Sequence, residues 1–211
     1  EAISPGAYPI HEGGNVVGDI HAEAGDVEAA FRECDYVFED RYTTQAVHHG
    51  AIEPHVAIAD YGPDGKLTVW SPCQNTFAFR VIMARIFGLS YNKIRMVSPA
   101  IGGAFGGKLE LTAEPVAAVL SMMAGRPVKL EYNRRECILS TRVRHPSVSY
   151  IKTGFMKDGT LKAADFKVYL NTGAYASSAL NVGGAMSHKV FKAYKIDHMR
   201  FQCQPVYTNT E

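Results

Sequence analysis

A cluster of glycines near the middle of the chain places the strictest limit on its fold. Residues 102–108 read G-G-A-F-G-G-K, with four glycines within six residues. Glycine adopts positive φ and lets the backbone approach a ligand closely, and the successive amides of such a turn can point at an anion. A strand pattern at 93–97 precedes the cluster, and a helical pattern at 115–124 follows it, with Pro115 near the start and Gly125 after the end. We predict a glycine-rich loop between a strand and a helix.

Strand patterns outnumber helical patterns along the rest of the chain. Helices are predicted at 27–32, capped by Asp26, and at about 77–87, ended by Gly88. Aromatic and β-branched content predicts strands at 36–44, 55–60, 67–70, 128–132, 147–156 and 161–170. Turn sequences at 61–65 and 157–160 indicate two hairpins. The sequence therefore predicts an α+β fold, with mixed or antiparallel strands and a few packed helices.

Composition narrows the class of protein. The 211 residues are 46% hydrophobic, enough for a genuine core, in one domain or two small lobes. A formal charge of +1 without a basic block argues against a nucleic-acid partner. The sequence has no uninterrupted run of about 18 apolar residues, so we predict no membrane-spanning segment. The four cysteines are far apart, which favours buried thiols over a zinc or iron–sulfur site. A reducing, cytoplasmic setting is the default expectation.

A phosphate-binding loop is one alternative for the glycine cluster. Gly102, Gly107 and Lys108 have the spacing of its glycines and lysine, but Leu109 stands where a Ser or Thr would bind magnesium. This residue argues against a nucleotide binder. A plain mobile turn is the other alternative.

The order of short motifs resembles the molybdenum hydroxylases, the family of xanthine dehydrogenase and aldehyde oxidase. Besides the glycine cluster, the matching segments are Gly18-Asp19, Gly25–Glu28, His49–His55, Trp70–Thr76, Gly125–Val128, Arg144–Pro146, Asp158-Gly159 and Thr208-Asn209. The resemblance implies that 19–211 are an incomplete molybdopterin-binding domain of a larger chain, after a linker-like stretch at 1–18. The absence of an initial Met agrees with an excised piece.

The resemblance implies a role for several residues of this chain. Gln74 matches a glutamine whose amide donates a hydrogen bond to the apical oxo group of molybdenum, and Phe105 and Gly106 match positions against the metal's ligands. Gly103 and Gly107 would help hold the cofactor. Gln74 and Phe105 would thus contact ligands of the metal rather than the metal. Taken alone, Gln74 could be a polar residue at a helix start, and Phe105 an ordinary core aromatic.

Two positions depart from the purine-oxidising branch of the family. Leu109 stands where that branch has a glutamate, and Ala185 where it has an arginine. Glu110 is one residue late, which turns it by about 100° on a helix or to the other face of a strand. The loss of both charged groups argues against xanthine and favours an aldehyde or another N-heterocycle.

The resemblance also implies a mechanism and partners. In the family a glutamate removes a proton from the metal-bound hydroxyl, which attacks an electron-poor carbon while hydride passes to the sulfido ligand, so that the new oxygen comes from water. That glutamate belongs to a later motif without a counterpart here, so this chain alone should bind the molybdenum–molybdopterin cofactor weakly and be inactive. Whether the cofactor is the cytosine dinucleotide form stays open. Iron–sulfur clusters and FAD should reside in other domains or subunits.

Three further hypotheses about function and residue roles stay open. A non-catalytic assembly module with the same fold is the alternative from another functional class. The group of His48, His49, His55 and Glu53 fits no zinc motif, so structural hydrogen bonding is favoured. Arg142, Arg144 and His145 could reach a cofactor phosphate or lie on a solvated face, and they are left unassigned.

Overall fold

The computed structural model describes residues 2–210 and divides the chain into two compact units. The first unit comprises Glu1–Val47 and His145–Glu211, and the second comprises His48–Arg144, inserted between those two stretches. Short strands β3 (Val47–His48) and β8 (Val143–Arg144) lie where the chain passes from one unit to the other. The expected division at residue 18 stays a prediction.

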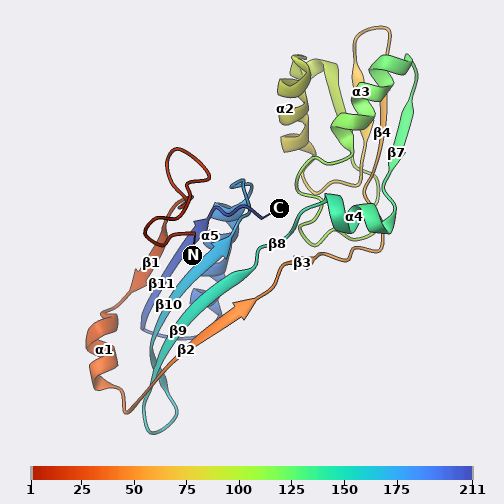
Figure 1. The fold of residues 1–211 in the computed structure, drawn as a ribbon. Helices are drawn as coiled ribbons and strands as arrows, with labels where there is room; N and C mark the ends of the chain where they lie inside the picture. Colours follow the sequence, from red (N-terminus) through yellow and green to blue (C-terminus); the bar gives the residue numbers. More distant parts are fainter. Residues whose placement is uncertain (1, 211) are drawn as a thin grey trace. The chain divides into compact units, whose positions relative to one another are not determined.

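A five-stranded sheet forms the first unit (Figure 1). Its order is β1-β11-β10-β9-β2, and all neighbours are antiparallel except β10 and β11. The strands are β1 (Ile20–Ala24), β2 (Tyr36–Thr44), β9 (Ser147–Phe155), β10 (Leu161–Asn171) and β11 (His198–Val206). The predicted strands at 36–44, 147–156 and 161–170 are confirmed.

Two helices pack on this sheet. α5 (Ala179–Ala193) makes the crossover that the parallel pair β10 and β11 needs, and it packs against β11 and β1. Its core contains Phe201 and Cys203 of β11 with Val168 and Leu170 of β10. The short helix α1 (Val27–Glu33) packs on β10 and β11 and begins at Asp26, whose carboxylate accepts the Ala29 N–H at 2.9 Å. The predicted cap is confirmed.

A four-stranded sheet with the order β6-β5-β4-β7 forms the second unit. The strands are β4 (Val56–Tyr61), β5 (Leu67–Trp70), β6 (Ile94–Val97) and β7 (Val128–Glu131). β4 and β5 are the predicted hairpin, and the parallel pair β5 and β6 is joined through helix α2 (Thr76–Phe87) and the 3₁₀ turn η1 (Tyr91–Lys93). Gly88 ends α2 in the left-handed conformation, as predicted.

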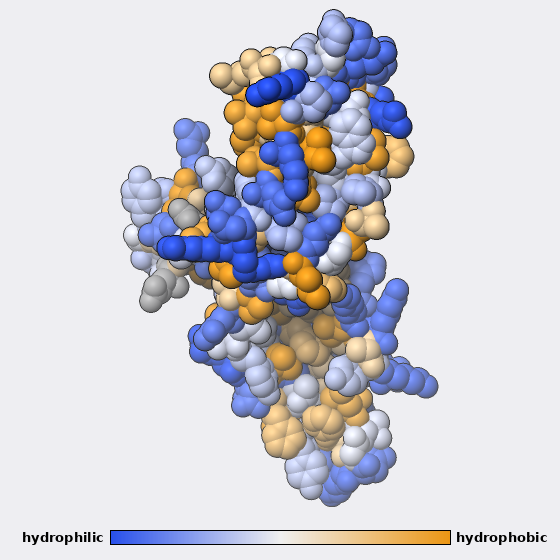
Figure 2. Space-filling view, turned by 90° about the vertical axis from the view of Figure 1, so that its right-hand side faces the viewer, coloured by the Kyte–Doolittle hydropathy of each residue, from blue (hydrophilic) through white to orange (hydrophobic). Residues whose placement is uncertain are grey.

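Helix α3 (Glu114–Ala124) covers this sheet at β4 and β7, and α4 (Arg134–Ser140) follows β7. The core beneath α3 is built from small and aliphatic side chains, among them Ala117, Ala118, Leu67 and Val69. α3 also carries large apolar side chains outward at i, i+3, i+4 and i+7, namely Val116, Val119, Leu120 and Met123. Hydrophobic surface gathers on the upper part of Figure 2. The predicted α+β class, with strands outnumbering helices, is confirmed.

Candidate functional site

The glycine loop, residues 102–108, lies between β6 and α3. Gly103 and Gly106 have φ values of +101° and +99°, which only glycine adopts without strain. A Cβ built at Gly106 would lie 3.3 Å from His49 Nε2, and one at Gly107 would lie 3.1 Å from His49 Nδ1. The loop backbone therefore needs glycine both for its conformation and for its close contact with His49.

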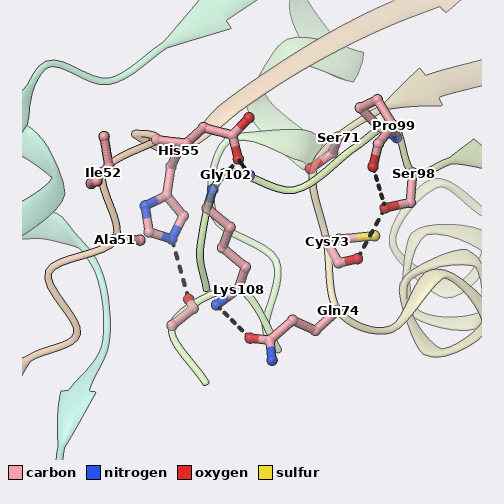
Figure 3. A network of polar contacts seen from close by, with 12 residues as sticks. Ala51, Ile52, His55, Ser71, Cys73, Gln74, Ser98, Pro99, Gly102 and Lys108 are labelled. Carbon is pink, nitrogen blue, oxygen red and sulfur yellow. Dashed lines mark hydrogen bonds and ion pairs between the residues drawn. The ribbon is translucent and has the colours of Figure 1, made fainter. Parts of the chain in front are cut away.

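Gln74 lies directly against this loop, at the start of α2 (Figure 3). Its side-chain Oε1 accepts the N–H of Gly106 at 3.1 Å and the N–H of Lys108 at 3.2 Å, and its own backbone N–H donates to Lys108 O at 2.9 Å. Three hydrogen bonds thus join position 74 to a loop more than 30 residues further along the chain.

The two backbone donors fix which way the Gln74 amide faces. Only the oxygen of a carboxamide can accept from an N–H, so Oε1 must point to the loop and Nε2 must point away. Gln74 is exposed, and within residues 2–210 its Nε2 donates to no protein acceptor. The chain therefore presents an uncharged hydrogen-bond donor whose orientation is set before any ligand arrives.

Phe105, at the tip of the loop, is not a core aromatic. It is 65% exposed and has a φ of +52°, a conformation that is a steric outlier for a bulky side chain. Such strain persists only where the surroundings impose it, and it clusters at ligand sites. Its ring is available to a ligand.

Lys108, at the end of the loop, is 3% exposed. Its Nζ lies 2.5 Å from Glu53 Oε2, and the same carboxylate oxygen accepts the N–H of Gly102 at 3.0 Å. The ammonium group is therefore engaged inside the protein. α3 begins at Glu114, six residues later, whereas a phosphate-binding lysine opens the helix itself. Both observations speak against the phosphate-loop alternative.

Hydrogen bonds from neighbouring segments support the loop and the segment that carries Gln74. His55 Nε2 lies 3.2 Å from Gly107 O, and burial lowers the pKa of His55, which favours its neutral form. Ser71, three residues before Gln74, donates to Glu114 Oε1 at 2.6 Å and so ties the end of β5 to the start of α3. These contacts come from the end of β5, the start of α3 and the segment 51–55.

The histidine group does not form a metal centre in the described part of the chain. Nowhere in residues 2–210 do three or more His, Cys, Asp or Glu side chains gather as metal ligands. Instead His48 Nδ1 accepts the Gly50 N–H, His55 contacts Gly107, and His49 packs beneath the glycines, its pKa lowered chiefly by burial. Arg142 pairs with Glu110 at 2.9 Å.

The two positions that the family resemblance relates to the substrate lie in different parts of the chain. Leu109 follows the loop and is 42% exposed, while Ala185 lies exposed on α5 of the first unit. A groove of about 1330 Å³ in the first unit contains neither residue nor any of the predicted cofactor contacts. Gln74, Gly103, Phe105, Gly106 and Gly107 are thus brought together within the second unit.

Sequence reasoning missed the Glu53–Lys108 pair. Local patterns relate Lys108 only to a phosphate role and Glu53 only to the neighbouring histidines. The sequence does offer one hint of the pair: Glu53 is a charged residue in a mostly apolar segment, and Lys108 is a charged residue at the end of the glycine-rich segment. The two residues are 55 positions apart, however, and a local pattern cannot predict that they form an ion pair.

Comparison with known proteins identifies relatives of this chain. Residues 10–211 match the family model of the molybdopterin cofactor-binding domain. The chain is 37% identical to a probable xanthine dehydrogenase subunit of Bacillus subtilis, and 36% identical to the nicotinate dehydrogenase large molybdopterin subunit of Eubacterium barkeri. Each match covers 99% of this chain, but 28% and 49% of those proteins.

A solved structure shows the same fold. The aldehyde oxidoreductase from Desulfovibrio gigas superposes with a TM-score of 0.88 at 30% identity, covering 99% of this chain and 23% of that protein. No helix within residues 2–210 is long and apolar enough to cross a bilayer. The chain belongs to the molybdopterin cofactor-binding domain family, of the xanthine dehydrogenase and aldehyde oxidase type of molybdenum hydroxylase.

Proposed function

We propose that this chain forms one wall of the molybdenum–molybdopterin site of a hydroxylase that oxidises an aldehyde or an N-heterocycle with oxygen from water. The observation that carries the proposal is the Gln74 amide, turned outward by the N–H groups of Gly106 and Lys108. It supports the expected hydrogen bond to an oxo ligand of the metal, because a carboxamide donates without adding charge and without titrating.

The residues present fit such a cofactor. Gln74 Nε2 is an oriented donor, Gly103 and Gly106 give the loop the positive φ values of a tight turn, and the Phe105 ring is exposed beside them. When bound, the group supplies a Lewis-acidic metal that accepts electrons. Gln74 would orient its oxo ligand, Phe105 would exclude water from the adjacent ligand, and Gly103, Gly106 and Gly107 would admit the cofactor against the backbone.

Catalysis needs parts that this chain does not supply. The expected general base is a glutamate of a later motif, so we propose that the isolated chain holds cofactor weakly and turns over nothing. The chain spans less than half the length of these relatives, which is consistent with further segments that complete the site. The choice between the plain and the cytosine dinucleotide cofactor rests with those segments.

Partners follow from the same reasoning. The outward apolar stripe of α3 suggests a face that the rest of the molybdopterin-binding chain covers. Electrons must leave through iron–sulfur clusters and FAD, which we place in other domains or subunits because Cys34, Cys73, Cys137 and Cys203 are separate free thiols. Free thiols also suit the reducing cytoplasm that we propose as its location.

The substrate proposal rests on two uncharged positions. Leu109 and Ala185 offer no charge to hold or polarise a purine, even though one relative is named as a probable subunit of xanthine dehydrogenase. Relatives are named for nicotinate and aldehyde substrates too. We therefore favour a substrate without the polarity of xanthine.

Metal analysis and a substrate screen of the full-length protein test the proposal. We expect about one molybdenum per chain and turnover of aldehydes or N-heterocycles, with xanthine the poorer substrate. A natural full-length protein that is free of molybdenum after expression in a cofactor-producing host would leave the assembly module as the better account.

A further inference from the structure

We propose that Glu53 and Lys108 are positioning residues of the molybdenum site, because one carboxylate fastens both ends of the glycine loop that orients Gln74. This inference rests on the function proposed above. It concerns side chains that present nothing to a ligand themselves.

Two contacts on the Glu53 carboxylate connect the ends of the glycine loop. Glu53 Oε2 receives the N–H of Gly102 at 3.0 Å and the Nζ of Lys108 at 2.5 Å, so a single oxygen atom joins the first and last residues of the loop. A backbone bond from Glu53 N–H to Gly102 O at 3.1 Å adds to the first of these contacts. A loop whose ends are tied in this way has few conformations left.

The fastening acts on the atoms that orient Gln74. The amide N–H of Lys108 donates to Gln74 Oε1, and the carbonyl of the same residue accepts the Gln74 N–H. Lys108 therefore contacts Gln74 through its backbone and Glu53 through its side chain. Loss of the Nζ contact frees the residue that holds two of the three hydrogen bonds on Gln74.

Glu53 is itself anchored from outside the loop. Arg134, the first residue of α4, donates from Nη2 to the carbonyls of Ala51 at 2.6 Å and Ile52 at 2.7 Å. These contacts fix the segment that carries Glu53. A continuous path of polar contacts thus runs from α4 through Glu53 and Lys108 to Gln74.

Burial makes the stability of the loop sensitive to the loss of either partner of the ion pair. The side chain of Lys108 is 4% exposed and that of Glu53 is 28% exposed. When one partner of such a pair is removed, the other is left as an uncompensated charge in a poorly solvated place. Each single neutralising substitution should therefore loosen the loop more than its change in size alone would.

Hydrogen exchange in the full-length protein, measured without added substrate, tests the fastening directly. We expect Lys108→Met to speed exchange of the amides in 102–108 at least tenfold, while β4 and β5 exchange as before. Glu53→Gln should have a smaller effect, because its carboxamide oxygen still accepts from Gly102. The combined variant should be no worse than Lys108→Met. Lys129→Met is the matched control, since it removes a lysine from an exposed pair with Glu131 in the same unit.

A second readout separates positioning from simple structural support. In molybdenum-loaded enzyme, Glu53→Gln should lower kcat at least fivefold with KM unchanged, because Gln74 faces the cofactor rather than the substrate. Unchanged loop exchange in both single variants, or equal acceleration throughout the unit, overturns the proposal. If Lys108→Met does not fold, Glu53→Gln alone decides. Wild-type protein without molybdenum would refute the proposed function and leave the exchange result standing.

Discussion

Gln74 Oε1 and the backbone nitrogen of Gly106 lie 3.1 Å apart, although 32 residues separate them in sequence. With the second contact from Lys108 N–H, this bond turns the Gln74 NH₂ group outward. The donor that the site would offer to a metal's oxo ligand is therefore prepared by the protein backbone.

Substitutions at Gln74 should separate its contact with the loop through Oε1 from its proposed role as a hydrogen-bond donor through Nε2. Gln74→Glu keeps an oxygen for the Gly106 and Lys108 amides but replaces the outward donor with an acceptor, so we expect kcat to fall on the order of a hundredfold with the loop intact. Gln74→Ala should lose both tasks and, in addition, retain less molybdenum. Steady-state kinetics and metal analysis of the full-length enzyme distinguish the variants, and an unchanged kcat in Gln74→Glu would contradict the assigned donor role.

A methyl group at Gly106 should be costly. Its φ of +99° and the 3.3 Å approach of His49 Nε2 predict that Gly106→Ala lowers the free energy of unfolding by about 1–3 kcal/mol. Gly125→Ala is the control, since that residue also has positive φ but nothing within 4 Å of its Cβ. Chemical denaturation should show the larger loss at Gly106, and metal content should fall only there.

Adjacent glycines in α5 provide a matched pair. A Cβ at Gly183 would meet Ile20 Cδ1 at 2.6 Å and Cys203 Sγ at 3.0 Å, whereas one at Gly184 meets nothing within 4 Å. We expect Gly183→Ala to destabilise by about 1–3 kcal/mol through overpacking, and Gly184→Ala to stabilise by about 0.5–1 kcal/mol through its better helix propensity. Equal effects of the two in thermal melts would show that α5 does not pack on β1 and β11 as described.

Acid should weaken the second unit through its buried histidines. Burial lowers the pKa of His55 and of His49 in the folded chain, so the unfolded state takes up protons first as pH falls. Stability is then fully present above the unfolded pKa of about 6.5 and declines below it. His55→Gln, which keeps a donor for Gly107 O without titrating, should reduce the loss of melting temperature between pH 7 and pH 5.5. A variant as acid-sensitive as the wild type would exclude His55 as a source.

Charged residues introduced at positions 109 and 185 should change the substrate preference. Leu109 and Ala185 are both exposed, so Leu109→Glu with Ala185→Arg should be accommodated without loss of stability. We expect kcat/KM for xanthine, relative to that for an aldehyde, to rise at least tenfold. No change in this ratio would mean that these two positions do not determine the substrate class.

Local sequence patterns predicted the elements whose signals are local. The cap at Asp26, the left-handed Gly88 and the hairpin between β4 and β5 each depend on a few adjacent residues. α5 was not predicted, because Gly183 and Gly184 weaken its intrinsic helix propensity. Its helix is stabilised by packing on β11 and β1 as the crossover between two parallel strands.

Four glycines in six residues are enough to identify 102–108 as a turn with little side-chain cover, and the order of motifs along the chain indicates the family. The direction of the Gln74 amide, the burial of Lys108 against Glu53 and the exposure of Phe105 at positive φ become visible only in the folded chain. These outcomes depend on hydrogen bonds and burial between segments 30 to 55 residues apart, and no local pattern of residue types encodes such contacts.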